Sequence, residues 1–337
     1  MAAPRSRAHT LAAAALGLTV ACAGCGGDEN TLQPRSHAEH SIALLWWVMF
    51  GVACFGFALI GALLALGWFR RRRAALTGPD AERRGTALVV GLGVVFPVAV
   101  VSALFIWSDI FVIRSTAAPP PASTAMTIQV TGHDWWWEVR YPGTPAVTAN
   151  EIHIPTHTRV NVVGTSDDVI HSLWVPELNR KIDLIPGRTN RVLLEADGPG
   201  IFRGQCSEFC GLQHAHMTVE VVAQPQPAFR AWLANMSKPA RAPATGAAQA
   251  GRTTFLASSC ASCHTVRGTA AHGDVGPDLT HLASRSTLAA VTIPNDAAQL
   301  RAWLEDPQRI KPGSKMPAVP LTGRQLDDLT AYLQGLR

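Results

Sequence analysis

The chain has 337 residues, which is too many for one ordinary domain and enough for two or three. Hydrophobic residues make up 47% and charged residues only 16%, a balance that points away from a wholly soluble protein. The net charge is +5, and most of it comes from one short arginine-rich loop, so the charge does not call for a nucleic-acid partner.

The N-terminus has the pattern of a secretory signal. Arg5 and Arg7 precede the apolar run "LAAAALGLTVACAGC", which is too short to span a membrane. We therefore predict a signal peptide over residues 1–25. Cleavage before Cys22 or Cys25 would resemble the processing of bacterial lipoproteins, and cleavage at an ordinary small-residue site is the alternative.

Two long segments carry no charge. Ile42–Phe69 is uncharged over 28 residues, and Ala87–Trp107 is also uncharged. Each is longer than the ~20 residues that cross a bilayer core. Buried core helices are the alternative, but soluble helices of this length have a polar face. We predict transmembrane helices at residues 42–69 and 87–113.

The loop between the two spans, residues 70–86, sets the orientation. It carries six arginines against Asp80 and Glu82, and the positive-inside rule places such a short loop in the cytoplasm. Everything after about Arg114 is then extracytoplasmic. The sequence predicts a protein of the bacterial inner membrane, surrounded by lipid, with its larger part on the periplasmic side.

The extracytoplasmic part begins with a Pro-rich linker, "STAAPPPAST". Between residues 124 and 223 the pattern is strand-like, with runs such as "MTIQVTG", "EIHIP" and "TNRVLLEA" bounded by Gly, Pro, Asn and Asp. Several short strands at this spacing predict an antiparallel sandwich or barrel of roughly 100 residues.

A second linker, "SKPARAPATGAAQA", covers residues 237–250 and is rich in Ala and Pro. The last segment, residues 251–337, returns to helical patterning in "LRAWLEDP" and "TGRQLDDLTAYLQGL". The sequence therefore predicts a separate all-α domain at the C-terminus.

This last domain contains "CASCH", Cys260 to His264, the C-x-x-C-H sequence of c-type haem attachment. The two thiols add to the haem vinyl groups, and His264 is placed to ligate the iron. Met316, in "KPGSKMPAV", is the candidate sixth ligand, with His272 and His281 as rivals. Ligation by Met and His raises the haem potential. The order of these motifs resembles a class I cytochrome c domain; a Cys260–Cys263 disulfide is the alternative.

The strand domain contains a second cluster of soft ligands, "GQCSEFCGLQHAHM", residues 204–217. Thiolate, imidazole and thioether together favour copper over magnesium, calcium or manganese. A mononuclear blue-copper site uses one cysteine, whereas two thiolates four residues apart can bridge two coppers. His171, in "DDVIHSLWVPEL", is placed to supply a second imidazole. A zinc site or a disulfide is the alternative.

Two apolar spans followed by "GHDWWWE", "DVIHSLWVPEL", "KIDLIPGR" and the cysteine-rich loop resemble subunit II of cytochrome c oxidase, with its binuclear copper (CuA) domain. The resemblance covers residues 42–222 and implies a cupredoxin-like Greek-key sandwich. It implies six copper ligands, of which Glu208 offers its backbone carbonyl: His171, Cys206, Glu208, Cys210, His214 and Met217. His216 matches no ligand position.

The same resemblance implies two further roles. Glu208 and Asp183 would help to hold a magnesium ion at the boundary with subunit I, as hard carboxylates suit that ion. Trp135 would lie near the copper site, where electrons arrive. One position departs from the family, since Val90 stands where many members have a glutamate associated with proton uptake.

With its haem domain, the chain resembles subunit II of a cytochrome-c-fused (caa3-type) oxidase. The implied enzyme reduces dioxygen to water with electrons from cytochrome c and couples this to proton movement. The two spans hold no set of histidines, so the oxygen-reducing haem and copper would belong to subunit I, with subunit III as a further partner. The alternatives are a nitric oxide reductase subunit with the same copper site and a non-enzymatic, membrane-tethered electron carrier or copper store.

Overall fold

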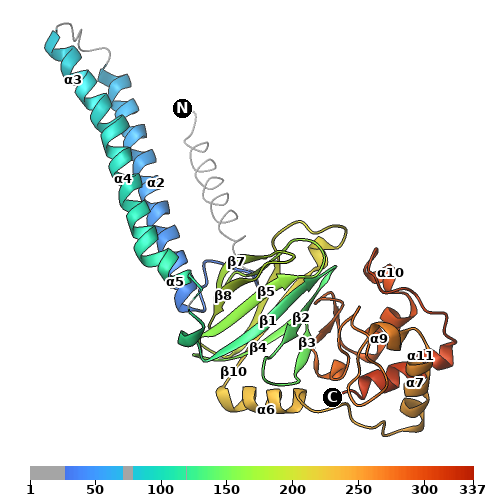
Figure 1. Ribbon diagram of the computed structural model, residues 1–337. Coiled ribbons are helices and arrows are strands. Elements are labelled where there is room, and N and C mark those ends of the chain that lie inside the picture. Colours follow the sequence, from blue (N-terminus) through green and yellow to red (C-terminus); the bar gives the residue numbers. More distant parts are fainter. Residues whose placement is uncertain (1–26, 71–78, 119) are drawn as a thin grey trace, which may run out of the picture.

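The computed structural model describes residues 27–70, 79–118 and 120–337. The predicted signal peptide, with Cys22 and Cys25, and the arginines at 71–73 lie outside the described residues. Figure 1 shows three parts in chain order: a pair of long helices, a β-sandwich and a small helical domain.

The helix pair has the length and composition of two membrane spans. The first helix is α2 (His37–Arg70). The second runs through α3 (Pro79–Val90), α4 (Phe96–Trp107) and α5 (Arg114–Thr116), with π-helical turns η1 (Gly91–Val95) and η2 (Ser108–Ile113) between them. Mean hydropathy in the most apolar part reaches 2.4 and 2.6 in the two helices. Pro97 lacks an N–H, so it cannot donate to the carbonyl four residues earlier, and the wide turn η1 lies at this point.

The β domain consists of two five-stranded sheets packed face to face. One has the order β3-β2-β1-β5-β8 and the other β4-β10-β9-β6-β7. The strands are β1 (Met126–His133), β2 (Trp136–Arg140), β3 (Val147–Ala149), β4 (Glu151–Pro155), β5 (Val160–Ser166), β6 (His171–Val175), β7 (Asn179–Leu184), β8 (Asn190–Leu194), β9 (Gly200–Cys206) and β10 (Thr218–Gln224).

The strand pattern alone predicted an antiparallel sandwich or barrel, but the observed sandwich also contains two parallel strand pairs. β1 pairs in parallel with β5, and β10 pairs in parallel with β4. The chain crosses between the sheets after β3, β4, β5, β7 and β8, so the strands of each parallel pair are far apart in the chain and are not joined by hairpins. The core between the sheets is apolar, with Trp137, Ile128 and Ile152 fully buried.

Helix α6 (Gln226–Met236) closes one end of the sandwich. Phe229 is buried in the sandwich core, and the Trp232 ring stacks on His153 with centroids 3.9 Å apart. The next helix, α7 (Gly246–Ala257), begins within the predicted linker of residues 237–250, because the side chain of Thr245 accepts a hydrogen bond from Ala248 N and caps the helix there.

The C-terminal domain is helical, with two short paired strands. Its helices are α7, α8 (Cys260–Cys263), α9 (Ala297–Glu305), α10 (Pro307–Ile310) and α11 (Gly323–Gln334); the strands are β11 (Thr287–Leu288) and β12 (Ile293–Pro294). Helices α7 and α11 cross at close range, because Gly251 has no Cβ to overlap the carbonyl of Asp328. Phe255 and Leu329 are buried at this crossing.

Candidate functional site

The cysteine-rich segment forms a closed loop between two strands. Strand β9 ends at Cys206, and the chain returns through the short helix η4 (His214–His216) to β10. Cys206 N donates to Met217 O at 2.9 Å, which joins the two ends of the loop. We call residues 206–217 the copper loop. Its two thiols are free, with 3.7 Å between the sulfur atoms.

The six predicted copper donors meet at this loop. His171, fully buried at the start of β6, has its Nδ1 3.9 Å from Cys206 Sγ, and the Glu208 carbonyl oxygen is 3.2 Å from the same sulfur. On the other side, Cys210 Sγ lies 3.6 Å from Nδ1 of His214 and 3.8 Å from Sδ of Met217. Each thiol therefore has its own imidazole and its own weaker donor.

The environment of the thiols favours metal binding. The hydrogen bond between the Cys206 and Cys210 sulfurs, together with that to His171, lowers the pKa of Cys206 although burial opposes this. The same hydrogen bond raises the pKa of Cys210, so the first thiolate forms at Cys206. Thiolate is the form that binds metal, and two thiolates with two imidazoles and a thioether form a donor set suited to copper.

An aspartate outside the predicted donor set orients His171. His171 Nε2 donates to Asp168 Oδ1 at 2.9 Å, and the backbone amides of Asp134 and Val169 donate to the same carboxylate. Burial raises the pKa of Asp168, but these hydrogen bonds outweigh it and lower the pKa to about 2. A carboxylate behind a histidine ligand fixes its tautomer and ring orientation. The acid three residues before His171 was the available signal.

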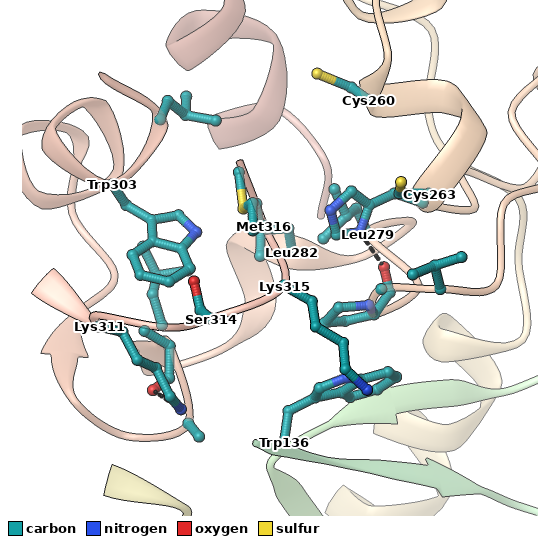
Figure 2. A pocket seen from close by; sticks show the side chains of 18 of the residues that line it. Trp136, Cys260, Cys263, Leu279, Leu282, Trp303, Lys311, Ser314, Lys315 and Met316 are labelled. Atoms are coloured by element: carbon teal, nitrogen blue, oxygen red, sulfur yellow. Dashed lines mark hydrogen bonds between the residues drawn. The ribbon is translucent and has the colours of Figure 1, made fainter. Parts of the chain in front are cut away.

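The C-terminal domain holds a pocket lined by all four predicted haem-binding residues, Cys260, Cys263, His264 and Met316. Figure 2 shows Cys260 and Cys263 on one side of this pocket and Trp303 on the other, with Met316 between them. His264 Nδ1 donates to Pro277 O at 2.8 Å, which leaves Nε2 as the nitrogen for iron. Burial lowers the pKa of His264, so the imidazole is neutral as a ligand must be.

The two rival histidines have other partners. His281 Nε2 donates to Lys238 O at 3.0 Å, and His272 forms an isolated bridge with Thr265. Neither is among the residues that line the pocket. Of the three candidates for the sixth ligand, the structure brings Met316 to the pocket.

The copper domain supplies one wall of the haem pocket, which the sequence did not predict. Asp134, Trp135 and Trp136 all line the pocket beside the residues of the C-terminal domain, and Figure 2 shows Trp136 at its edge. Trp135 also donates from Nε1 to Cys210 O at 2.9 Å, so this one side chain contacts both sites. Of the three adjacent tryptophans, Trp137 is the one buried in the sandwich core.

The two acids predicted to hold magnesium lie on adjacent segments. Asp183 pairs with Ser172 in the β6–β7 ladder, and Ser172 O accepts a hydrogen bond from Ser207 N, next to Glu208. Both acidic residues are exposed. The magnesium role remains a prediction.

The sequence matches two families. Residues 146–224 match the periplasmic domain of cytochrome c oxidase subunit II, and residues 248–337 match cytochrome c. The chain is also 33% identical over 334 residues to "Cytochrome c oxidase subunit 2" of Alkalihalophilus pseudofirmus, which covers 95% of both chains. The chain belongs to the cytochrome c oxidase subunit 2 family.

Other relatives match over shorter ranges. The cytochrome c oxidase subunit 2 of a Bacillus species (strain PS3) is 30% identical over 63% of this chain and 62% of its own. Among solved structures, the periplasmic domain of subunit II of cytochrome oxidase from Bradyrhizobium japonicum is 31% identical, covers 35% of this chain and 96% of its own, and has a TM-score of 0.33.

The family confirms the predicted class and fold: two apolar helices, a cupredoxin-like sandwich and a helical cytochrome c domain. This chain is subunit II of a cytochrome c oxidase with a fused cytochrome c domain, and it assembles with other oxidase subunits. The first domain implies copper and the second implies haem. The two candidate spans and the periplasmic domain fit an inner-membrane protein.

Proposed function

We propose that this chain is the electron-accepting subunit of a caa3-type oxidase. Electrons pass from an external cytochrome c to a haem held by Cys260, Cys263, His264 and Met316, then to a binuclear copper centre, and on to the oxygen-reducing site of subunit I, coupled to proton transport. When bound, the haem and the copper pair supply one-electron carriers. The chain's own residues hold these groups and set the distance between them.

The observation that carries the proposal is the position of Trp135 between two complete donor sets. Its indole nitrogen donates to the carbonyl of the copper-loop residue Cys210, and its side chain lines the haem pocket. We therefore propose Trp135 as the residue through which electrons reach the copper site.

The copper ligands are held in place by the protein itself. Asp168 fixes the His171 ring, and the hydrogen bond from Cys206 N to Met217 O closes the copper loop. Such a set is preorganised, so little rearrangement accompanies a change of oxidation state. This is the property that an electron relay requires.

The exposed edge of the copper loop is proposed to face subunit I. Phe209 is 78% exposed next to Glu208, and Ile170 is 45% exposed next to His171. Large apolar side chains exposed at a functional loop mark a protein interface.

At this proposed interface with subunit I, Glu208 and Asp183 would share a magnesium ion. Subunit III would complete the assembly, and the sandwich would lie on the periplasmic side. The match over 95% of a cytochrome c oxidase subunit 2 favours this reading over a nitric oxide reductase subunit or a tethered carrier.

The test is metal and haem analysis of the purified full-length chain in its oxidase. We expect two coppers bound by this chain and one covalent haem. Cys206→Ser should abolish the mixed-valence copper signal in electron paramagnetic resonance and leave the haem spectrum intact, whereas Cys54→Ser in the first span should change neither. One zinc and no copper at the loop after copper loading would contradict the proposal.

A further inference from the structure

The loop that carries the predicted haem ligand Met316 lies directly on the copper loop. We call residues 311–316 the methionine loop. Gln213 Nε2 donates to Pro312 O at 2.6 Å, and Gln213 precedes the copper ligand His214. Gly313 has a φ of +83° and sits under Leu212, where a Cβ would be 2.9 Å from Leu212 Cδ1. The two ligand-bearing loops therefore touch without any intervening layer.

Lys311 joins the two domains at the base of this contact. Its side chain is only 3% exposed. Nζ donates to Trp135 O at 2.7 Å and His216 O at 2.8 Å in the copper domain, and to Ala289 O at 3.2 Å in the haem domain. An ammonium group has three donors, and here all three have a carbonyl acceptor. Burial at this point lowers the pKa of Lys311 to about 7.

A second lysine of the methionine loop adds a weaker contact. Lys315 Nζ lies 3.2 Å from Asp168 Oδ2 and 3.7 Å from Asp134 Oδ2, and its side chain is 55% exposed. Exposed ion pairs contribute little and are screened by salt. Lys311, which is buried and bonded to both domains, is therefore the main attachment between the loops.

We propose that Lys311 is a positioning residue that locks the methionine loop onto the copper loop and so holds the haem and copper sites at a fixed separation. The inference rests on the proposed function, in which one electron moves from the haem site to the copper site and no bond or proton changes. Without the ammonium group, Trp135 O and His216 O lose this donor, and Ala289 O keeps only its hydrogen bond from Thr292 Oγ1. The chain still connects the haem domain to the copper domain, but the buried hydrogen bonds from Lys311 no longer fix its position.

The test compares Lys311→Met with Lys238→Met in the purified holoenzyme, since Lys238 is an exposed lysine that belongs to neither loop. In Lys311→Met, hydrogen exchange should increase in peptides covering residues 206–217 and 311–316, with the copper and haem spectra unchanged. After flash reduction of the haem, electron transfer to copper should slow by at least about tenfold, which corresponds to roughly 1.4 kcal/mol of free energy lost from the docked arrangement. The transfer rate should also become dependent on solvent viscosity. Lys238→Met should behave as wild type.

The outcomes separate this inference from the proposed function. If the wild-type enzyme shows no transfer from haem to copper, the proposed function fails. If wild type transfers and Lys311→Met transfers equally fast with unchanged exchange, the positioning role of Lys311 fails alone. If Lys311→Met does not assemble, Gln213→Ala provides the test, because it removes the hydrogen bond to Pro312 O. Increased hydrogen exchange in the methionine loop would support the contact between the loops as the feature that positions the haem domain, and unchanged exchange would overturn it.

Discussion

The copper site and the haem pocket are built in different ways. All six proposed copper donors come from one domain, and five of them come from a single loop whose ends are hydrogen-bonded together. The proposed haem donors come from two segments, residues 260–264 and Met316, and the copper domain supplies one wall of their pocket. The copper site is therefore complete within its domain, whereas the haem pocket is completed by its neighbour.

Removing the haem domain tests this difference most strongly. Truncation after Ser237 should leave the copper site loaded, because no donor is lost, and should slow turnover with the physiological donor by about 100-fold or more, because a tethered donor is replaced by a bimolecular encounter. Copper content and oxygen uptake are the measurements. Loss of copper on truncation would show that the copper site also depends on its neighbour.

A matched pair of glycines sharpens the comparison, because each site has one directly behind a histidine ligand. A Cβ at Gly132 would lie 2.7 Å from His171 Cδ2, and one at Gly276 would lie 2.5 Å from His264 Cε1. Overpacking costs about 1–3 kcal/mol. Gly132→Ala should weaken copper binding, and Gly276→Ala should disturb the haem spectrum.

Copper titration and visible spectra of the two variants check this prediction. Gly198→Ala, where a Cβ meets nothing within 4 Å, is the control. If either variant disturbed both sites equally, the two sites would not be separate units.

Asp168→Asn should have a smaller effect, confined to the copper site. Carboxylates behind histidine ligands are worth 10- to 100-fold in metal affinity, and we expect about tenfold here, because an asparagine oxygen in the place of Oδ1 can still accept from His171 Nε2 and Val169 N. Competition with a copper chelator measures the affinity. The haem spectrum should not change, and an unchanged copper affinity would remove Asp168 from the site.

The smallest expected effect is a pH dependence at the domain interface. Glu151, which is buried, accepts hydrogen bonds from Ser286 N and Oγ of the haem domain. Burial raises the pKa of Glu151, but hydrogen bonds from His153 and Ser286 outweigh it and lower the pKa below its ordinary 4.5. Because the pKa of Glu151 is lower in the docked state, its ionised carboxylate stabilises docking fully above pH 4.5. This contribution is lost as the pH falls through the lowered pKa.

Small-angle scattering of the holoenzyme should therefore show the haem domain moving away from the copper domain only when the pH falls below the lowered pKa of Glu151. Arg285 and His153 also face Glu151 and set its charge environment. Glu151→Gln should remove this step in the pH profile. If the profile of the variant matched wild type, another group would be responsible.

The sequence predicted those features that depend on local pattern. Uncharged length predicted the helix pair, and the spacing of the copper loop, together with the family resemblance, predicted the donors that the structure brings together. Met316 was favoured over its rivals by its sequence context, and the structure brings it to the pocket.

Features that depend on distant contacts could not be predicted in this way. Lys311 stands in "KPGSKM", which looks like an exposed turn, and its burial depends on Trp135 and His216, far away in the chain. Trp136 likewise lines the haem pocket only because residues far away in the chain, in the C-terminal domain, pack beside it. The two parallel strand pairs depend on where the chain crosses between sheets, and residue alternation does not report this.

The short connection between the two domains limits where an electron can go. Helix α6 is packed on the sandwich up to Met236, and α7 begins at Gly246, so nine residues join them. Fully extended, such a segment spans at most roughly 30 Å. In the proposed function, a haem domain on so short a connection could not reach the copper loop of an oxidase complex beyond that range, and each electron that it accepted would pass to its own complex.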